Sequence, residues 1–203
     1  GIVSLHTIMK LFTTYTQYDQ RYADHETFSK DRSACGMFAL MAIHKFLTHS
    51  TFTKTEHEDS IDEAIQSIVD MGIYGQTTFE ELLQFTTLDN STIGTGPELI
   101  NTGIISYDAM FLDKNKRYAT LFLKNGKFFV VLHDTVSYTV IDCHETTQHS
   151  FTDKNDLIKH LNTVYQFNTD INIDGYKIPE YSNIEFKIVE NAFEFQMLRQ
   201  NIS

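Results

Sequence analysis

The chain has 203 residues, of which 41% are hydrophobic, and it contains only two prolines and nine glycines. This length and composition predict one folded domain with a substantial core, and they exclude a linker-rich or disordered protein. The formal net charge of −11 excludes a typical nucleic-acid-binding surface, which needs clustered Lys and Arg.

The sequence also predicts the cellular compartment of the protein. No apolar stretch is long enough to span a membrane, and the first ten residues lack the pattern of a signal peptide. The two cysteines, Cys35 and Cys143, are too few and too far apart for a disulfide framework. We therefore expect an intracellular, reducing compartment, which is the host cytosol if the source is a virus or an intracellular bacterium. Because the chain begins with Gly1, we also consider it a piece excised from a longer protein.

The first half of the chain predicts helices. Residues 35–47 have only His44 and Lys45 as polar breaks, which is typical of a helix buried nearly all round. Two amphipathic helices follow, each opened by a capping box: Ser60 with Glu63, and Thr77 with Glu80.

The second half predicts strands. ATLFLKNGKFFVVLHD contains two β-rich runs joined by Asn125-Gly126, a pair that favours the tight turn of a hairpin. With YTVIDCH, residues 118–144 make a three-stranded antiparallel meander. A helix capped near Asp153 follows, and INIDGYKI and NIEFKIV are weaker strand candidates. Helices first and an antiparallel sheet second predict an α+β fold.

Cys35 stands at the start of the buried helix, in DRSACGMFAL. The N-terminus of a helix lowers the pKa of a thiol, and the thiolate is the nucleophilic form. The ordinary alternative is a core thiol, because free cysteine is among the most buried residue types. A metal site is disfavoured, since neither EHED nor the pair His144 and His149 has a recognised zinc spacing.

Asp142 and His144 are the candidate partners of that thiol. In a strand, residues two apart face the same side, so the carboxylate and the imidazole would lie together while Cys143 faces away. An aspartate bonded to one ring nitrogen orients the imidazole, and the other nitrogen can take a proton from a thiol. His133, which Asp134 follows, is the competing base, but these adjacent residues would point to opposite faces.

The polar segment YTQYDQRY, residues 15–22, offers a donor for an oxyanion. A glutamine amide can stabilise the negative oxygen that forms when a nucleophile attacks a carbonyl. Gln17 is the first candidate and Gln20 the reserve, and the alternative is an ordinary solvated loop.

TQYDQRY, SACGMFALMAIHKFL and YTVIDCHE followed by SFTDKNDLIKHL together resemble the herpesvirus tegument deubiquitinases and their tegument-like relatives. The resemblance runs from about Thr16 to Leu161. It implies a papain-like cysteine protease fold, a single catalytic domain over residues 1–203, and hydrolysis of the isopeptide bond after the C-terminal glycine of ubiquitin. It also implies four roles: Cys35 as nucleophile, His144 as general base and later acid, Asp142 as its orienter, and Gln17 as oxyanion donor.

The sequence departs from the family pattern near the nucleophile. The gap from Gln17 to Cys35 is longer than usual, and Ala34 stands where many relatives have glutamine, so the backbone N–H of Cys35 with another side chain is an alternative oxyanion donor. Ubiquitin or its chains are the expected partner of a monomer without metal or organic cofactor. The arginines of the ubiquitin tail would meet carboxylates, for which the candidates are Asp19, Asp24, Asp59, Asp62, Glu80 and Glu81.

Two other hypotheses remain open at the level of sequence. A papain-like peptidase, a transglutaminase or an acyltransferase acting on a different protein would use the same Cys-His-Asp set. A non-catalytic interaction module would keep Cys35 in its core. The sequence does not distinguish among ubiquitin linkages, and chains through the most N-terminal lysine of ubiquitin are one hypothesis.

Overall fold

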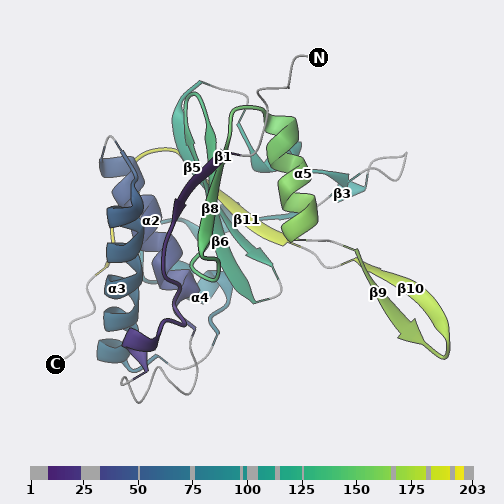
Figure 1. The fold of residues 1–203 in the computed structure, drawn as a ribbon, viewed down its shortest axis with the longest axis horizontal. Coiled ribbons are helices and arrows are strands. Elements are labelled where there is room, and N and C mark those ends of the chain that lie inside the picture. The colour runs from purple at the N-terminus through teal and green to yellow at the C-terminus, as the bar shows by residue number, and fades with distance from the viewer. Residues whose placement is uncertain are drawn as a thin grey trace.

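The computed structural model describes residues 9–23, 33–49, 51–73, 76–96, 98–99, 105–112, 115–124, 126–165, 168–181, 184–192 and 195–198. In this part of the chain, helices pack against a seven-stranded antiparallel sheet, so the protein has the expected α+β composition (Figure 1). None of the helices in these ranges is long and apolar enough to cross a membrane.

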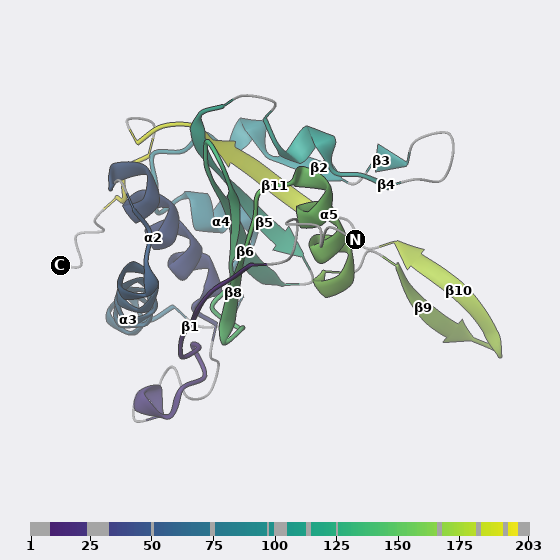
Figure 2. The same ribbon diagram turned by 45° about the horizontal axis from the view of Figure 1, so that its top comes forward.

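The main sheet has the strand order β1-β8-β7-β6-β5-β11-β2. Its strands are β1 (Met9–Thr13), β2 (Gly94–Gly96), β5 (Arg117–Lys124), β6 (Lys127–Asp134), β7 (Tyr138–Ile141), β8 (Thr147–Phe151) and β11 (Ile184–Val189). Two smaller pairs are β3 (Glu98–Leu99) with β4 (Ile105–Ser106), and β9 (Asn168–Ile173) with β10 (Tyr176–Tyr181). The β9–β10 hairpin extends away from the main sheet (Figures 1 and 2).

Helices cover both faces of the sheet. The longer elements are α2 (Cys35–Thr48), α3 (Lys54–Met71), α4 (Phe79–Leu83) and α5 (Lys154–Val164), and the short 3-10 turns are η1 (Gln20–Tyr22), η2 (Asn90–Thr92) and η3 (Asp108–Met110). The helices α2, α3 and α4 share one hydrophobic core, while α5 and η3 belong to a second core on the opposite face (Figure 2).

Strand β6 separates the two cores because its side chains alternate between the faces of the sheet. Phe128, Val130 and Leu132 belong to the core beneath α2, whereas Phe129 and Val131 belong to the core beneath α5. A strand that is buried on both faces reads as a continuous apolar run, which explains the sequence KFFVVLHD.

The predicted meander is present. Lys124 pairs with Lys127 across a two-residue turn, in which Gly126 has a φ of 76°. This left-handed conformation is the one for which glycine is suited, and Asn125 lies outside the described residues. Strands β5, β6 and β7 follow one another in antiparallel pairing, and the helix after Asp153 begins at Lys154 as expected.

Both predicted capping boxes of the central helices were wrong. Helix α3 begins at Lys54, because Thr53 and Glu56 form its capping box, and Ser60 lies inside the helix with its hydroxyl bonded to the Glu56 carbonyl at 2.6 Å. Helix α4 is capped by Thr78, one residue after the predicted Thr77, through the N–H of Glu81. A Ser or Thr three residues before Glu recurs in this part of the chain, so the motif alone selects the wrong member.

The predicted strand over YTVIDCH ends earlier than expected. Strand β7 stops at Ile141, and Asp142, Cys143 and His144 lie in the connection to β8. Strands β1 and β8 were not predicted at all. They pair with each other, with Thr13 opposite Thr147, and β1 is the edge strand of the sheet.

Candidate active site

Cys35 is the first residue of α2, which is a helix of 14 residues. The first N–H groups of a helix have no acceptor within it, and the aligned peptide dipoles favour negative charge there. The residue is only 3% exposed, and the helix that it heads is buried along most of its length. The thiol therefore lies at the end of the helix where backbone N–H groups point outward.

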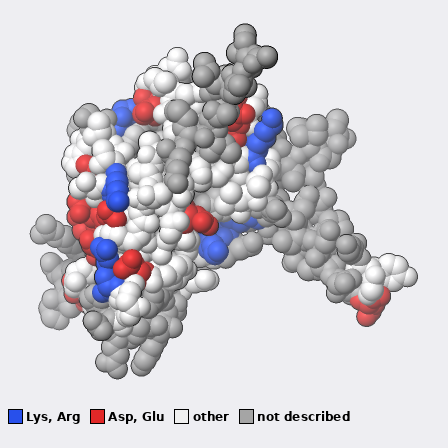
Figure 3. Space-filling model, in the orientation of Figure 1, with Lys and Arg blue, Asp and Glu red and all other residues white. Residues whose placement is uncertain are grey.

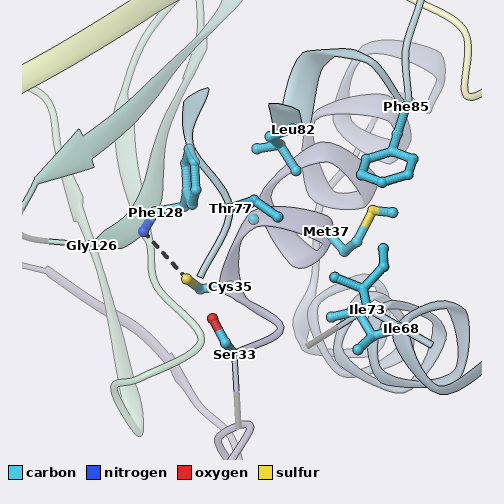
Figure 4. Close-up of a pocket in the computed structure, with 11 residues that line it drawn as sticks. Ser33, Cys35, Met37, Ile68, Ile73, Thr77, Leu82, Phe85, Gly126 and Phe128 are labelled. Atoms are coloured by element: carbon cyan, nitrogen blue, oxygen red, sulfur yellow. Dashed lines mark hydrogen bonds between the residues drawn. The ribbon is translucent and has the colours of Figure 1, made fainter. Parts of the chain in front are cut away.

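The sulfur of Cys35 accepts a hydrogen bond from the backbone N–H of Phe128 at 3.4 Å (Figure 4). This donor follows from strand register. Lys124 and Lys127 close the hairpin, so the N–H of Phe128 points away from β5, toward the side of β6 where β7 runs. Pairing between β6 and β7 ends at Val130 and Ile141, and the sulfur takes the place of the missing strand as acceptor.

His144 connects Cys35 to Asp142. It is close enough to Cys35 for the two side chains to interact electrostatically, and its Nδ1 lies 2.5 Å from Oδ1 of Asp142. The same carboxylate oxygen accepts the backbone N–H of His144 at 2.9 Å, which fixes the turn that carries both residues. The side chains of His144 and Asp142 are 8% and 5% exposed, so the pair is largely shielded from water.

The surroundings of His144 favour its charged form. Burial alone would lower its pKa, but the hydrogen bonds to Asp142 and Cys35 and the charges of these groups raise the pKa to about 9. Burial likewise disfavours the Asp142 carboxylate, yet its bonds to His144 and Tyr165 hold the pKa of Asp142 below its usual range. These interactions favour an imidazolium that lies between two acceptors, a carboxylate and a sulfur.

Two residues not identified from the sequence hold Asp142. The hydroxyl of Tyr165 donates to Oδ2 of Asp142 at 2.5 Å. The side-chain amide of Gln148 brackets the backbone of Asp142, accepting from its N–H at 2.8 Å and donating to its carbonyl at 3.1 Å. Nothing in the local pattern around Tyr165 or Gln148 signals these roles, because both contacts depend on how β7, β8 and α5 are arranged in space.

Gln17 is buried beside the head of α2. After β1, the chain continues along the turn that carries His144, with the N–H of Gln17 donating to the Cys143 carbonyl at 3.0 Å. Its Oε1 accepts the N–H of Ala34 at 2.9 Å. The Nε2 group of Gln17 is consequently the part of the amide that can donate to a group next to Cys35.

Tyr18 lies at the mouth of this site. Its ring is 6.0 Å from that of His144, its residue is 47% exposed, and its side chain hydrogen-bonds with that of Gln17. Burial raises the pKa of its hydroxyl, the bond to Gln17 opposes this effect, and the nearby charges of Cys35 and Asp142 raise the pKa further. Tyr18 thus interacts electrostatically with Cys35 and Asp142 as well as with Gln17.

An apolar pocket adjoins Cys35 on the side of α3 and α4 (Figure 4). Its walls come from α2, α3, α4 and the β5–β6 hairpin, and they include Met37, Ile68, Leu82, Phe85 and Phe128. Ser33 lies beside the thiol at the opening of this pocket. The cavity itself measures about 10 Å³, which is about the space of one water molecule.

Two further candidates from the sequence have other surroundings than Cys35. His133 bonds through Nδ1 to the Lys116 carbonyl at 2.9 Å and packs between Tyr118 and Tyr138, so it has a different environment from Cys35. Gln20, the reserve oxyanion donor, is exposed in η1.

The acidic candidates have several different surroundings. Asp19 caps η1 and pairs with Arg21, and Asp62 accepts hydrogen bonds from Tyr15 and Tyr22. Asp59, Glu80 and Glu81 are exposed, and Asp24 falls outside the described residues. Acidic side chains gather along the side of the molecule formed by α3 (Figure 3).

Within the described ranges, one group of three side chains has donor atoms close enough together to hold a metal ion, namely Asp142, Cys143 and His144. The carboxylate and the imidazole of this group are already bonded to each other, and Cys143 is a fully buried thiol whose pKa burial raises. A protonated thiol is a poor metal ligand, so the donor set suits a hydrogen-bonded pair better than an ion.

No protein-family profile matches the chain, and no curated protein is significantly similar to it in sequence. Among solved structures, it is similar to the ubiquitin-specific protease encoded by a murine cytomegalovirus tegument protein, which was crystallised in complex with a ubiquitin-based suicide substrate. The TM-score is 0.56 at 10% sequence identity, and the alignment covers 97% of this chain and 89% of the viral one. At this identity the similarity establishes a shared fold.

Proposed function

We propose that this protein is a thiol-dependent deubiquitinase that hydrolyses the isopeptide bond after the C-terminal glycine of ubiquitin. The observation that carries the proposal is the meeting of Cys35, His144, Asp142 and Gln17 at the head of one helix. The shared fold with a ubiquitin-specific protease supports ubiquitin as the substrate. The acidic balance of the chain suits a tail that carries arginines.

The proposed reaction begins with attack of the Cys35 thiolate on the carbonyl carbon of the last glycine. The oxygen that becomes negative accepts hydrogen bonds from Nε2 of Gln17 and from the backbone N–H of Cys35. As the C–N bond breaks, the His144 imidazolium gives its proton to the leaving lysine amine. A thioester between Cys35 and ubiquitin remains. Neutral His144 then takes a proton from water, which attacks the thioester and expels the Cys35 thiolate. The carboxylic acid of ubiquitin that forms loses its proton to solvent, and the thiolate and imidazolium are restored.

Asp142 has a supporting part in this scheme. Its carboxylate selects the tautomer of His144 in which Nδ1 carries a proton, and it stabilises the imidazolium. The scheme uses no metal and no organic cofactor, and we propose that the protein acts as a monomer in a reducing intracellular compartment. Both cysteines are free thiols, and the scheme requires that Cys35 remain so.

The experiment that tests the proposal is labelling with a ubiquitin probe that carries a C-terminal electrophile. The wild type should form a covalent adduct, and Cys35→Ala should form none. Cys143→Ala is the matched control, because it removes the other buried thiol and should still be labelled. Labelling that persists in Cys35→Ala would contradict the assignment of the nucleophile.

Iodoacetamide separates the remaining alternatives. Rapid alkylation of Cys35 near neutral pH without any reaction with ubiquitin probes would indicate a cysteine enzyme for another protein substrate. A thiol that stays inert in the folded protein would indicate a non-catalytic module. Cleavage of a panel of differently linked di-ubiquitins then defines linkage preference.

A further inference from the structure

Tyr165 links the second hydrophobic core to the candidate active site. It is the C-terminal cap of α5, and its N–H donates to the Leu161 carbonyl at 2.8 Å. Its ring stacks on Phe129 with centroids 3.8 Å apart and an interplanar angle of 5°. Phe129 in turn stacks on Phe122 of the neighbouring strand, so the tyrosine ring forms one end of a stack of three aromatic rings.

The hydroxyl of this ordered ring reaches the carboxylate of Asp142. Each carboxylate oxygen has a separate donor: Oδ1 bonds to His144, and Oδ2 accepts from Tyr165 at 2.5 Å. A hydrogen bond from an O–H group to an anionic oxygen is one of the stronger hydrogen bonds in proteins. Because Asp142 is buried, the oxygen has little water to replace Tyr165 if the hydroxyl is removed.

We propose that Tyr165 is a positioning residue that extends the triad to a relay of Cys35, His144, Asp142 and Tyr165, an inference that rests on the proposed thiol chemistry. The hydroxyl fixes the rotation of the Asp142 carboxylate, so that Oδ1 stays aligned with Nδ1 of His144. Its ring contacts lie on the α5 face, on the opposite side of the sheet from α2. The residue therefore acts on the reaction through Asp142 and does not touch the substrate.

The β-sheet explains why this function falls to a residue on α5. Asp142 follows the end of β7, where the chain leaves the sheet between the two cores. One oxygen of the carboxylate is hydrogen-bonded to His144 in the turn after β7, and the other is hydrogen-bonded to Tyr165 at the end of α5. A carboxylate at such a position needs donors from both sides, and Tyr165 is the side chain that supplies the second one.

Tyr165→Phe tests the proposal because it removes the hydroxyl and keeps the stacked ring. On a fluorogenic ubiquitin substrate, kcat should fall roughly tenfold with KM unchanged, as expected for the loss of one hydrogen bond to a charged group. Iodoacetamide alkylation of Cys35 should also slow roughly tenfold at pH 6.5, and the difference should close as the pH rises past the ordinary thiol range near 8.5. Tyr118→Phe is the matched control, since it removes a buried tyrosine hydroxyl that bonds to the backbone of Leu112, and it should leave both measurements unchanged.

A double-mutant cycle with Asp142→Ala separates positioning from a general loss of stability. In the Asp142→Ala background, Tyr165→Phe should have no further effect on the alkylation rate, because its partner is already gone. Independent losses that multiply in the double variant would overturn the proposal, as would an alkylation profile in Tyr165→Phe equal to that of the wild type. Alkylation needs no ubiquitin, so a protein that ignores ubiquitin probes yet shows this coupling would refute the proposed substrate and retain the relay.

Discussion

At the scale of single residues, the candidate site combines hydrogen-bond acceptors, an imidazole that can carry a charge, and a neutral amide. Cys35 and Asp142 are acceptors, His144 stands between them, and Gln17 faces the cluster with a neutral amide. One half of that amide is used structurally, since Oε1 binds the N–H of Ala34 just before α2. Gln17 therefore fixes the entrance to the helix, and in the proposed reaction its Nε2 group donates to the reacting carbonyl.

Gln17→Ala should lower kcat on a ubiquitin substrate by about 10²- to 10³-fold, because the proposed oxyanion loses a preorganised donor. Alkylation of Cys35 by iodoacetamide creates no oxyanion at that position, so its rate should change little. The exposed Gln20→Ala is the control and should match the wild type in both assays. Equal losses in alkylation and hydrolysis would mean that Gln17 supports only the structure of the α2 entrance.

The residues of the site differ in how far the sequence reveals them. Cys35, Asp142, His144 and Gln17 can be selected by their recognisable chemistry, and Cys35 also by its place at a helix start. The strand geometry predicted for Asp142 and His144 was wrong, because both lie in the turn after β7. Tyr165, Gln148 and the N–H of Phe128 cannot be selected from the sequence, because each contributes through a contact between elements distant in sequence. A tyrosine on an amphipathic helix looks like a core residue until its hydroxyl is placed.

At the scale of elements, the prediction succeeded where periodicity and turn chemistry were strong. The buried helix from Cys35, the hairpin around Gly126 and the helix after Asp153 all agree with the structure. Strands β1 and β8 carry polar residues and lie toward one edge of the sheet, so neither alternation nor a long apolar run marks them. Their pairing matters for the site, because β1 leads the chain to Gln17.

The capping of α3 can be tested directly against the sequence motif. Thr53→Ala should reduce the free energy of unfolding by about 1 kcal/mol, because the hydroxyl and the Glu56 carboxylate satisfy free N–H groups at the helix start. Ser60→Ala should change it by less than about 0.5 kcal/mol, since a mid-helix hydroxyl bonded to the preceding turn gives little net stability. Chemical denaturation measures both, and the reverse order would restore Ser60 as the cap.

At the scale of the whole molecule, stability depends on how α3 is packed against the rest. His57 of α3 is fully buried among the rings of Phe12, Phe38 and Phe52, which come from β1, α2 and the segment before α3. Neither ring nitrogen has a hydrogen-bond partner among the residues that the structure describes. Burial lowers the pKa of His57 from 6.5 to about 3, although the charge of Asp142 opposes the shift.

This buried histidine predicts a loss of stability in acid. The unfolded chain binds a proton near pH 6.5 while the folded protein does not, so the free energy of unfolding should fall as the pH drops from 6.5 toward 3. The contribution of His57 over this range is on the order of 4 kcal/mol. His57→Leu should make the dependence shallower, whereas His49→Leu, at an exposed position, should leave it as it is. Denaturation curves across this pH range decide the matter, and equal slopes in the wild type and His57→Leu would contradict it.

The short length of β7 determines how closely the head of α2 approaches β6. Pairing between β6 and β7 ends at Val130 and Ile141, so Lys127, Phe128 and Phe129 have no partner in β7, and the Cys35 sulfur at the head of the helix accepts the N–H of Phe128. Extending the pairing of β7 as far as Phe128 would place a backbone acceptor where the sulfur now lies and displace the sulfur, although every strand of the sheet would remain. The length of the connection between Ile141 and β8 thus determines the geometry of the site. Insertions there should allow the protein to fold and should abolish its reaction.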